Sequence, residues 1–263
     1  MRPERIPAVA GLFYPAAASE LERDVVRFLA HAQGEDAEPK ALILPHAGYV
    51  YSGPVAATGY KCLAERRASV RRVVLIGPTH RALYQGIATS GAKAFVTPLG
   101  RVPVDHVAVK AAEALPHVLR HDAAHAPEHC LEVHLPFLQV VLDEFSIVPL
   151  LVGDASPAEV ADVLEALWGD DETIVVVSSD LSHYHDYGTA RVLDHETSEA
   201  IEAFDTTPIH GRRACGHLPI KGLLLLAERR ALAVTRLDLR SSGDTAGPRE
   251  QVVGYGAWAF AEA

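Results

Sequence analysis

Short apolar runs alternate along the chain with longer stretches of helical periodicity. Four of these runs are rich in β-branched residues and bounded by Gly, Pro or Asp, a pattern typical of strands buried on both faces. They cover residues 41–44, 72–76, 146–152 and 173–177. Candidate helices cover residues 19–31, 54–64, 107–114, 129–144, 157–168, 189–203 and 217–230. This alternation predicts a mainly parallel sheet with helices on both faces.

The C-terminal part of the chain differs from the centre. Residues 231–240 and 251–261 are strand-like and are joined by the turn-rich sequence SSGDTAGPRE, which predicts a late antiparallel addition to the sheet. Near the N-terminus, the polar residues 34–39 are expected to connect the first helix to the first core strand. We find no internal repeat and no low-complexity linker, so we expect one domain over residues 1–263.

Composition narrows the class of protein. The 263 residues are 49% hydrophobic and 22% charged, as in ordinary soluble globular proteins. The net charge of −10, without a basic block, argues against a protein that binds nucleic acid. No apolar stretch approaches the roughly 18 residues of a membrane span, and Glu4 with two prolines makes the N-terminus a poor signal peptide. We therefore expect a cytoplasmic protein without membrane partners.

The three cysteines are an odd number at unrelated spacings, which favours a reducing compartment and free thiols. Cys62 lies inside a helical pattern and Cys130 at a predicted helix start, and both are interpreted as structural. Cys215 directly precedes an apolar helix, where the helix dipole is expected to lower its pKa and favour a thiolate. The alternative for Cys215 is a small buried hydrophobe, but its flanking Gly and Pro favour a functional loop.

Polar side chains follow three of the core strands. His46 comes after residues 41–44, His80 after residues 72–76, and Asp180 with His183 after residues 173–177. The carboxyl ends of parallel strands meet at one edge of a sheet, where ligands bind. The alternative is that these residues simply belong to loops, which are polar in general. That alternative explains a histidine after one strand more easily than polar residues after all three strands. Neutral imidazole is the commonest metal ligand, and a nearby carboxylate can complete or orient the set.

A further group of titratable residues opens the predicted helix 129–144. The sequence EHCLEVHLPF contains Glu128, His129, Glu132 and His134. These residues are candidates for the second shell of a metal site or for a substrate contact, and a solvated helix start is an equal alternative. Walker A, dinucleotide Gly-x-Gly-x-x-Gly and paired Cys-x-x-Cys motifs are missing, which argues against nucleotide enzymes and zinc ribbons.

Five ordered motifs together resemble the Memo family, whose prokaryotic members are also called AmmeMemoRadiSam system protein B. They are PHAGYVYSG (45–53), GPTH (77–80), EHCLEVHLPF (128–137), SSDLSHY (178–184) and ACG (214–216). The resemblance extends from PAVAGLFYP at residues 7–15 to VGY at residues 253–255. It implies a three-layer α/β/α sandwich around a mostly parallel, mixed sheet, similar to the class III extradiol dioxygenases, with the site at the strand ends.

The resemblance also implies a ligand set. His46, His80 and Cys215 match the family's two histidines and cysteine, and Asp180 and His183 match residues that line the same pocket. A thiolate is softer than the carboxylate of the dioxygenase iron site, which favours copper or zinc over a ring-cleaving Fe(II) site. Iron or copper, with zinc as a further candidate, is therefore the expected cofactor.

Two functions of different classes follow. The first is a metal-dependent redox enzyme in which His183 is the general acid/base and Asp180 orients it or polarises a bound water. The second is a non-catalytic protein that uses the pocket to bind a peptide or a modified side chain. In both cases a small molecule or peptide occupies the pocket, and the family name implies a radical-SAM enzyme and a second small protein as partners.

Overall fold

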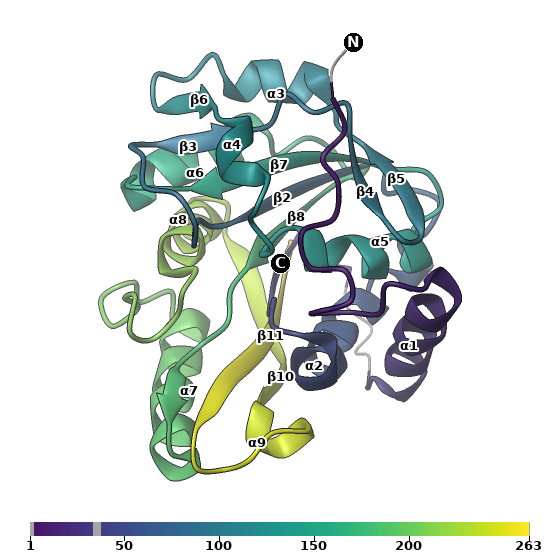
Figure 1. The fold of residues 1–263 in the computed structure, drawn as a ribbon. Helices are drawn as coiled ribbons and strands as arrows, with labels where there is room; N and C mark the ends of the chain where they lie inside the picture. The colour runs from purple at the N-terminus through teal and green to yellow at the C-terminus, as the bar shows by residue number, and fades with distance from the viewer. Residues whose placement is uncertain (1–2, 34–37, 263) are drawn as a thin grey trace.

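A central β-sheet separates two layers of helices in the computed structural model, which describes residues 3–33 and 38–262 (Figure 1). The strands of this sheet are β1 (Ala41–Leu44), β2 (Arg72–Pro78), β3 (Ile87–Thr89), β6 (Val118–Arg120), β7 (Ser146–Val152), β8 (Thr173–Ser178), β9 (His183–His185), β10 (Leu232–Ser241) and β11 (Val252–Glu262). A separate hairpin consists of β4 (Ala94–Thr97) and β5 (Gly100–Pro103).

Helices cover both faces of the sheet, as the sequence pattern predicts. The α-helices are α1 (Ala18–His31), α2 (Tyr49–Lys61), α3 (His106–Ala112), α4 (Asp122–His125), α5 (Leu135–Val141), α6 (Pro157–Ala166), α7 (Tyr187–Glu202), α8 (His217–Arg229) and α9 (Ser242–Thr245). Short 3-10 helices are η1 (Ala64–Arg66) and η2 (Glu132–His134). One layer contains α1, α2 and α5, and the other contains α6, α7 and α8 (Figure 1). The three-layer α/β/α architecture is confirmed.

The centre of the sheet is parallel and its sides are mixed. In the order β10-β11-β1-β8-β2-β7-β3-β6, the four strands from β1 to β7 run parallel. Leu44 pairs with Ser178, and Ile76 pairs with Val177. The carboxyl ends of β1, β8 and β2 therefore lie side by side, and the loops that follow them share one edge.

Antiparallel strands extend the parallel core. On one side β11 pairs antiparallel with β1, β10 and β9, which confirms the late antiparallel addition. On the other side β3 runs antiparallel to β7. The sequence did not predict β3, β4, β5, β6 and β9, because these short segments lack four consecutive aliphatic residues such as the ALIL of β1. The connector at residues 241–250 also contains α9, where Ser241 and Asp244 form a capping box.

Two predicted helices differ from the observed ones. The helix predicted over residues 54–64 is α2, which begins at Tyr49 and contains Pro54 in its interior. The helix predicted over residues 129–144 is replaced by a turn, η2 and the short α5. The carboxylate of Glu128 accepts the backbone N–H groups of His129 and Cys130, and this fixes a turn where the sequence indicated a helix.

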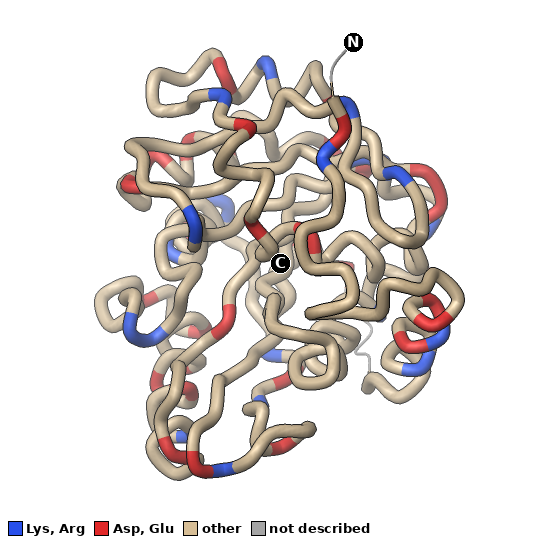
Figure 2. Tube along the Cα trace, viewed as in Figure 1, with Lys and Arg blue, Asp and Glu red and all other residues tan. Residues whose placement is uncertain are grey.

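The remaining expectations concern the surface and the cysteines. Within the described residues, no helix is both long enough and apolar enough to cross a membrane. Basic and acidic residues are interspersed along the trace (Figure 2). No disulfide bond joins Cys62, Cys130 or Cys215. Most of the predicted connector at residues 34–39 lies outside the described residues, which resume at residue 38.

Candidate metal centre

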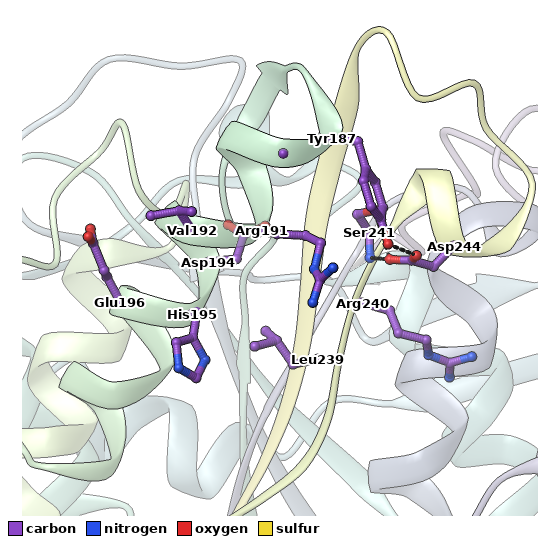
Figure 3. A pocket seen from close by; sticks show the side chains of 11 residues that line it. Tyr187, Arg191, Val192, Asp194, His195, Glu196, Leu239, Arg240, Ser241 and Asp244 are labelled. Carbon is purple, nitrogen blue, oxygen red and sulfur yellow. Dashed lines mark hydrogen bonds between the residues drawn. The ribbon is translucent and has the colours of Figure 1, made fainter.

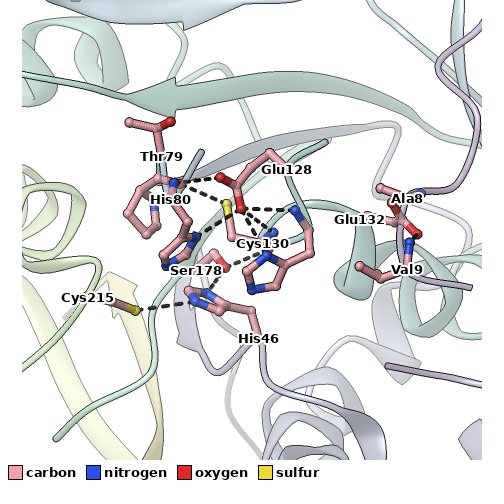
Figure 4. A network of polar contacts seen from close by, with 12 residues as sticks. Ala8, Val9, His46, Thr79, His80, Glu128, Cys130, Glu132, Ser178 and Cys215 are labelled. Atoms are coloured by element: carbon pink, nitrogen blue, oxygen red, sulfur yellow. Dashed lines mark hydrogen bonds and ion pairs between the residues drawn. The ribbon is translucent and has the colours of Figure 1, made fainter. Parts of the chain in front are cut away.

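Two histidines and one cysteine converge at the carboxyl edge of the sheet (Figure 4). His46 follows β1, His80 follows β2, and Cys215 lies just before α8. One ligand atom from each lies within 4.8 Å of the other two, and Cys215 Sγ is 3.3 Å from His46 Nε2. Tetrahedral bonds of about 2.0–2.3 Å place neighbouring nitrogen and sulfur ligands about 3.5 Å apart. The three side chains therefore fit one transition-metal ion with only small movements.

His46 is held from two directions. Its Nδ1 lies 2.7 Å from Ser178 Oγ, and its backbone N–H donates to Asp180 Oδ1 at 2.8 Å. Burial holds the pKa of His46 well below its usual range, so the ring is neutral. These contacts leave Nε2 directed toward Cys215, as a metal ligand requires.

His80 is held by a carboxylate. Its Nδ1 lies 2.9 Å from Glu128 Oε1, and its backbone N–H donates to Glu128 Oε2 at 2.6 Å. Burial alone would raise the pKa of Glu128, but the hydrogen bonds from His129 and His80 hold that pKa far below its usual range. A carboxylate behind a histidine fixes the ring and its tautomer in many metal sites. Here it leaves His80 Nε2 for the ion.

A second group that could hold an ion consists of His80, Glu128 and His129, whose ligand atoms also lie within 4.8 Å of one another. Glu128 already accepts N–H groups from His80, His129 and Cys130. An ion on this carboxylate would displace several of those hydrogen bonds. The group with Cys215 needs no such loss, and His129, whose ring stacks on His80 with centroids 4.8 Å apart, borders it.

Cys215 is hydrogen-bonded to the loop after β8. Its backbone N–H donates to the Asp180 carbonyl at 3.2 Å, and the Asp180 N–H donates to Cys215 Sγ at 3.3 Å. The next residue must be glycine, because a Cβ at Gly216 would lie 2.6 Å from the Ser178 carbonyl oxygen. This close approach brings the sulfur within reach of His46.

The pKa expected for Cys215 was wrong in direction. Gly216 caps α8 and Cys215 precedes it, but burial, followed by the charge of Asp180, raises the pKa of Cys215 to about 12. Removal of the thiol from water therefore outweighs the helix dipole. Without an ion the side chain is a thiol, and binding a metal releases its proton.

Asp180 lies between β8 and β9, and His183 lies at the start of β9. Asp180 Oδ2 is 4.0 Å from His46 Nε2, on the side of the ring that faces Cys215, and burial raises the pKa of Asp180. His183 begins β9, and its Nδ1 lies 2.7 Å from the Leu181 carbonyl oxygen. Their acid/base roles stay predictions.

The structure separates the two glutamates and two histidines of the EHCLEVHLPF motif. His134 Nε2 lies 2.8 Å from Ser178 Oγ, so it joins His46 through that hydroxyl. Burial lowers the pKa of His134 to about 3. Glu132 instead accepts the backbone N–H groups of Ala8 and Val9, away from the histidines (Figure 4). Sequence reasoning did not single out Ser178, because a serine at the end of a strand has no distinctive pattern.

Two cavities differ in their relation to these residues. One of about 690 Å³ lies beside Cys215 and is lined by Thr79, Leu83, Leu218 and Pro219 among others. Another of about 630 Å³ lies between α7 and β10 (Figure 3). Of the three predicted ligands, Cys215 lines the first cavity, and none lines the second.

Comparison with known proteins identifies the family of the chain. The family described as Memo-like protein matches residues 5–259. A MEMO1 family protein of Thermotoga neapolitana is 36% identical over 95% of this chain and 97% of the relative. Another, of Methanopyrus kandleri, is 36% identical over 98% of this chain and 99% of the relative. The crystal structure of an uncharacterized protein from Escherichia coli K12 shares the fold, with a TM-score of 0.51 and 14% identity over 82% of this chain and 98% of that chain. The chain belongs to the Memo-like protein family.

Proposed function

We propose that the chain is a metal-dependent redox protein that holds one iron or copper ion on His46, His80 and Cys215. The observation that carries this proposal is the convergence of three ligand atoms within 4.8 Å of one another. Both imidazoles also have their Nδ1 atoms occupied by hydrogen bonds at 2.7 and 2.9 Å, so that Nε2 is the available ligand atom in each.

The three ligand atoms favour some metals over others. One sulfur and two imidazole nitrogens form a softer set than the two histidines and carboxylate of non-haem iron oxygenases, which favours copper, while zinc also fits. A bound iron or copper ion would supply electron transfer and Lewis acidity. Asp180 and His183 would hold or move protons beside it, because Asp180 Oδ2 lies 4.0 Å from His46 Nε2.

A second candidate function is binding without catalysis. The cavity of about 690 Å³ beside Cys215 has apolar walls that include Leu83, Leu218 and Pro219. Such a cavity suits a peptide or a modified side chain. A radical-SAM enzyme and a second small protein are proposed partners in either case. The cytoplasmic location, and the expectation of no nucleic-acid or membrane partner, stay predictions.

Elemental analysis separates these functions when it is combined with an oxygen electrode. The protein is purified without oxygen and without an affinity-tag metal. We expect about one iron or copper ion per chain, and only a small fraction of it in Cys215→Ser. Dioxygen consumption only by the loaded protein would support the redox function. Pocket binding that survives chelation, without dioxygen consumption, would favour the binding function. Full metal content in Cys215→Ser would contradict the proposed ligand set.

A further inference from the structure

A chain of hydrogen bonds runs from the candidate metal centre into the core behind His46. His46 Nδ1 lies 2.7 Å from Ser178 Oγ, and His134 Nε2 lies 2.8 Å from the same oxygen. His134 Nδ1 in turn lies 2.8 Å from the Tyr60 hydroxyl. Each of these four side chains is at least 98% buried, so water does not compete for their hydrogen bonds.

The positions of the protons follow from the acceptor at the centre of this chain. Ser178 Oγ also lies 2.7 Å from the Cys130 carbonyl oxygen. A carbonyl can only accept, so the single hydroxyl proton of Ser178 points to Cys130. The two imidazole nitrogens that face Ser178 must then both donate. His134 therefore carries its proton on Nε2, and its Nδ1 accepts from Tyr60.

The same argument fixes His46 with its proton on Nδ1 and a lone pair on Nε2. The competing tautomer would have its proton on Nε2 and could donate it to Cys215 Sγ, 3.3 Å away. In that form Nδ1 and Ser178 Oγ would face each other at 2.7 Å without a proton between them. A buried polar pair that loses its hydrogen bond is strongly unfavourable.

We propose that Tyr60, His134 and Ser178 are positioning residues that hold His46 in the Nδ1–H tautomer before any ion arrives. The purpose of this arrangement rests on the proposed metal function, but the tautomer is a property of the metal-free chain. His80 reaches the same tautomer through the charged acceptor Glu128. At His46 a neutral serine has that role: its proton points to the Cys130 carbonyl, and His134, which accepts from Tyr60, donates to the same serine oxygen.

The direct test is a long-range ¹H–¹⁵N correlation spectrum of the metal-free protein with ¹⁵N-labelled histidine. This spectrum distinguishes protonated from unprotonated ring nitrogens, and His46→Gln and His134→Gln assign the two rings. We expect a single Nδ1–H tautomer at His46 and a single Nε2–H tautomer at His134. A His46 ring with its proton on Nε2, or one that averages between both forms, would overturn the proposal without any variant of Ser178.

Variants then test the role of each residue, with zinc(II) as a redox-silent probe in chelator competition. Ser178→Ala should release His46 to the Nε2–H form or a mixture, and zinc affinity should fall by about 10- to 100-fold. Tyr60→Phe removes only the donor to His134 Nδ1 and leaves the Ser178 acceptor in place, so His134 should remain Nε2–H, with a smaller loss of affinity. Ser52→Ala is the matched control, because it removes a buried hydroxyl that donates to the Ala47 carbonyl at 2.8 Å.

These experiments distinguish a wrong positioning role from a wrong metal function. If Ser178→Ala keeps His46 as Nδ1–H and binds zinc about as tightly as the wild type, the positioning role is wrong. If that variant does not fold, Tyr60→Phe decides, since a His134 ring that changes to Nδ1–H there would contradict the assignment of the Ser178 proton to the Cys130 carbonyl. Wild-type protein that shows both expected tautomers but binds no metal would contradict the proposed function and still support the hydrogen-bond assignment.

Discussion

Glu128 and Glu132 are four residues apart in one motif, and both are buried, yet they stabilise different parts of the molecule (Figure 4). Glu128 accepts from the ring and the backbone of His80 and from the backbone of His129. Glu132 accepts from the backbone of Ala8 and Val9 at 2.7 and 3.1 Å.

The two carboxylates differ in the chemistry of their hydrogen-bond partners. Glu132 also pairs with the buried Arg5 guanidinium and with the Tyr14 hydroxyl, which tie the N-terminal segment to the core. An imidazole bound through Nδ1 still has Nε2 to offer, so Glu128 passes its orientation on to a ligand. Burial and charge alone therefore do not show that a carboxylate supports a metal site. What distinguishes Glu128 is that its partner, His80, has a second ring nitrogen that can bind an ion.

Removal of the Glu132 charge should have the largest effect. In Glu132→Gln the buried Arg5 loses its counter-charge, and a broken buried pair typically destabilises by about 3–5 kcal/mol. Urea unfolding of the metal-free protein measures this. Glu4→Gln is the control in the same segment, since Glu4 pairs with the exposed Lys93 and Arg101, and should change stability by less than about 1 kcal/mol. Similar losses in both variants would contradict the comparison.

Glu128→Gln should act on metal affinity more than on folding. The amide keeps one acceptor oxygen, but it no longer imposes the Nδ1–H tautomer on His80, and the loss of such a partner typically lowers metal affinity by about 10- to 100-fold. Zinc competition measures the affinity, and Glu132→Gln, where it remains folded, should bind zinc as the wild type does. Equal affinities in the two variants would remove the distinction between the two carboxylates.

The buried His125, near the Arg5–Glu132 pair, should make the stability of the protein depend on pH. His125, whose carbonyl accepts from Arg5 at 3.2 Å, has its pKa lowered to about 4 by burial. The unfolded state, with an ordinary pKa near 6.5, then binds more protons between about pH 6.5 and pH 4, so stability falls as the pH falls through that window. By pH 5 this one residue should account for about 2 kcal/mol.

Urea unfolding of the metal-free protein at several pH values tests this slope. His125→Gln keeps a side-chain N–H for the Ala88 carbonyl, which the His125 ring contacts at 3.0 Å, and cannot take up a proton. The stability of this variant should fall less between pH 7 and pH 5. His195→Gln, at an exposed position, should keep the wild-type slope; a flattened slope there would count against the assignment to His125.

Cys130→Ser should have the smallest effect. Cys130 Sγ donates to the Pro78 carbonyl at 3.0 Å, and a serine hydroxyl can make the same contact. Burial also raises the pKa of Cys130 well above its usual range, so it remains a neutral thiol. Metal content by elemental analysis should be unchanged. A loss of metal would place this second thiol in the site.

The fold was predictable where single segments carry the information. The strands β1, β2, β7 and β8 are apolar over most of their length and could be recognised, and their order of appearance implied parallel pairing. Strands such as β3 and β6 have three residues each and depend on their neighbours for pairing. Their positions are decided by tertiary contacts that no local pattern contains.

The convergence of His46 and His80 could be predicted from the sequence more readily than the side chains that hold them. His46 and His80 follow recognisable strands, so the topology alone brings them to one edge. Tyr60 lies inside α2 and meets His134 only in the folded chain. The turn at residues 129–131 directs Glu128 and Glu132 apart, and the sequence pattern, which indicated a helix there, grouped the two carboxylates together.

X-ray absorption spectroscopy at the metal edge identifies the ligands of the bound ion. For protein loaded with one copper or zinc ion, we expect one sulfur at about 2.3 Å and two imidazole nitrogens at about 2.0 Å. The sulfur should disappear in Cys215→Ser and remain in Cys130→Ser. A wild-type spectrum without sulfur, or a sulfur that persists in Cys215→Ser, would contradict a metal centre built on His46, His80 and Cys215.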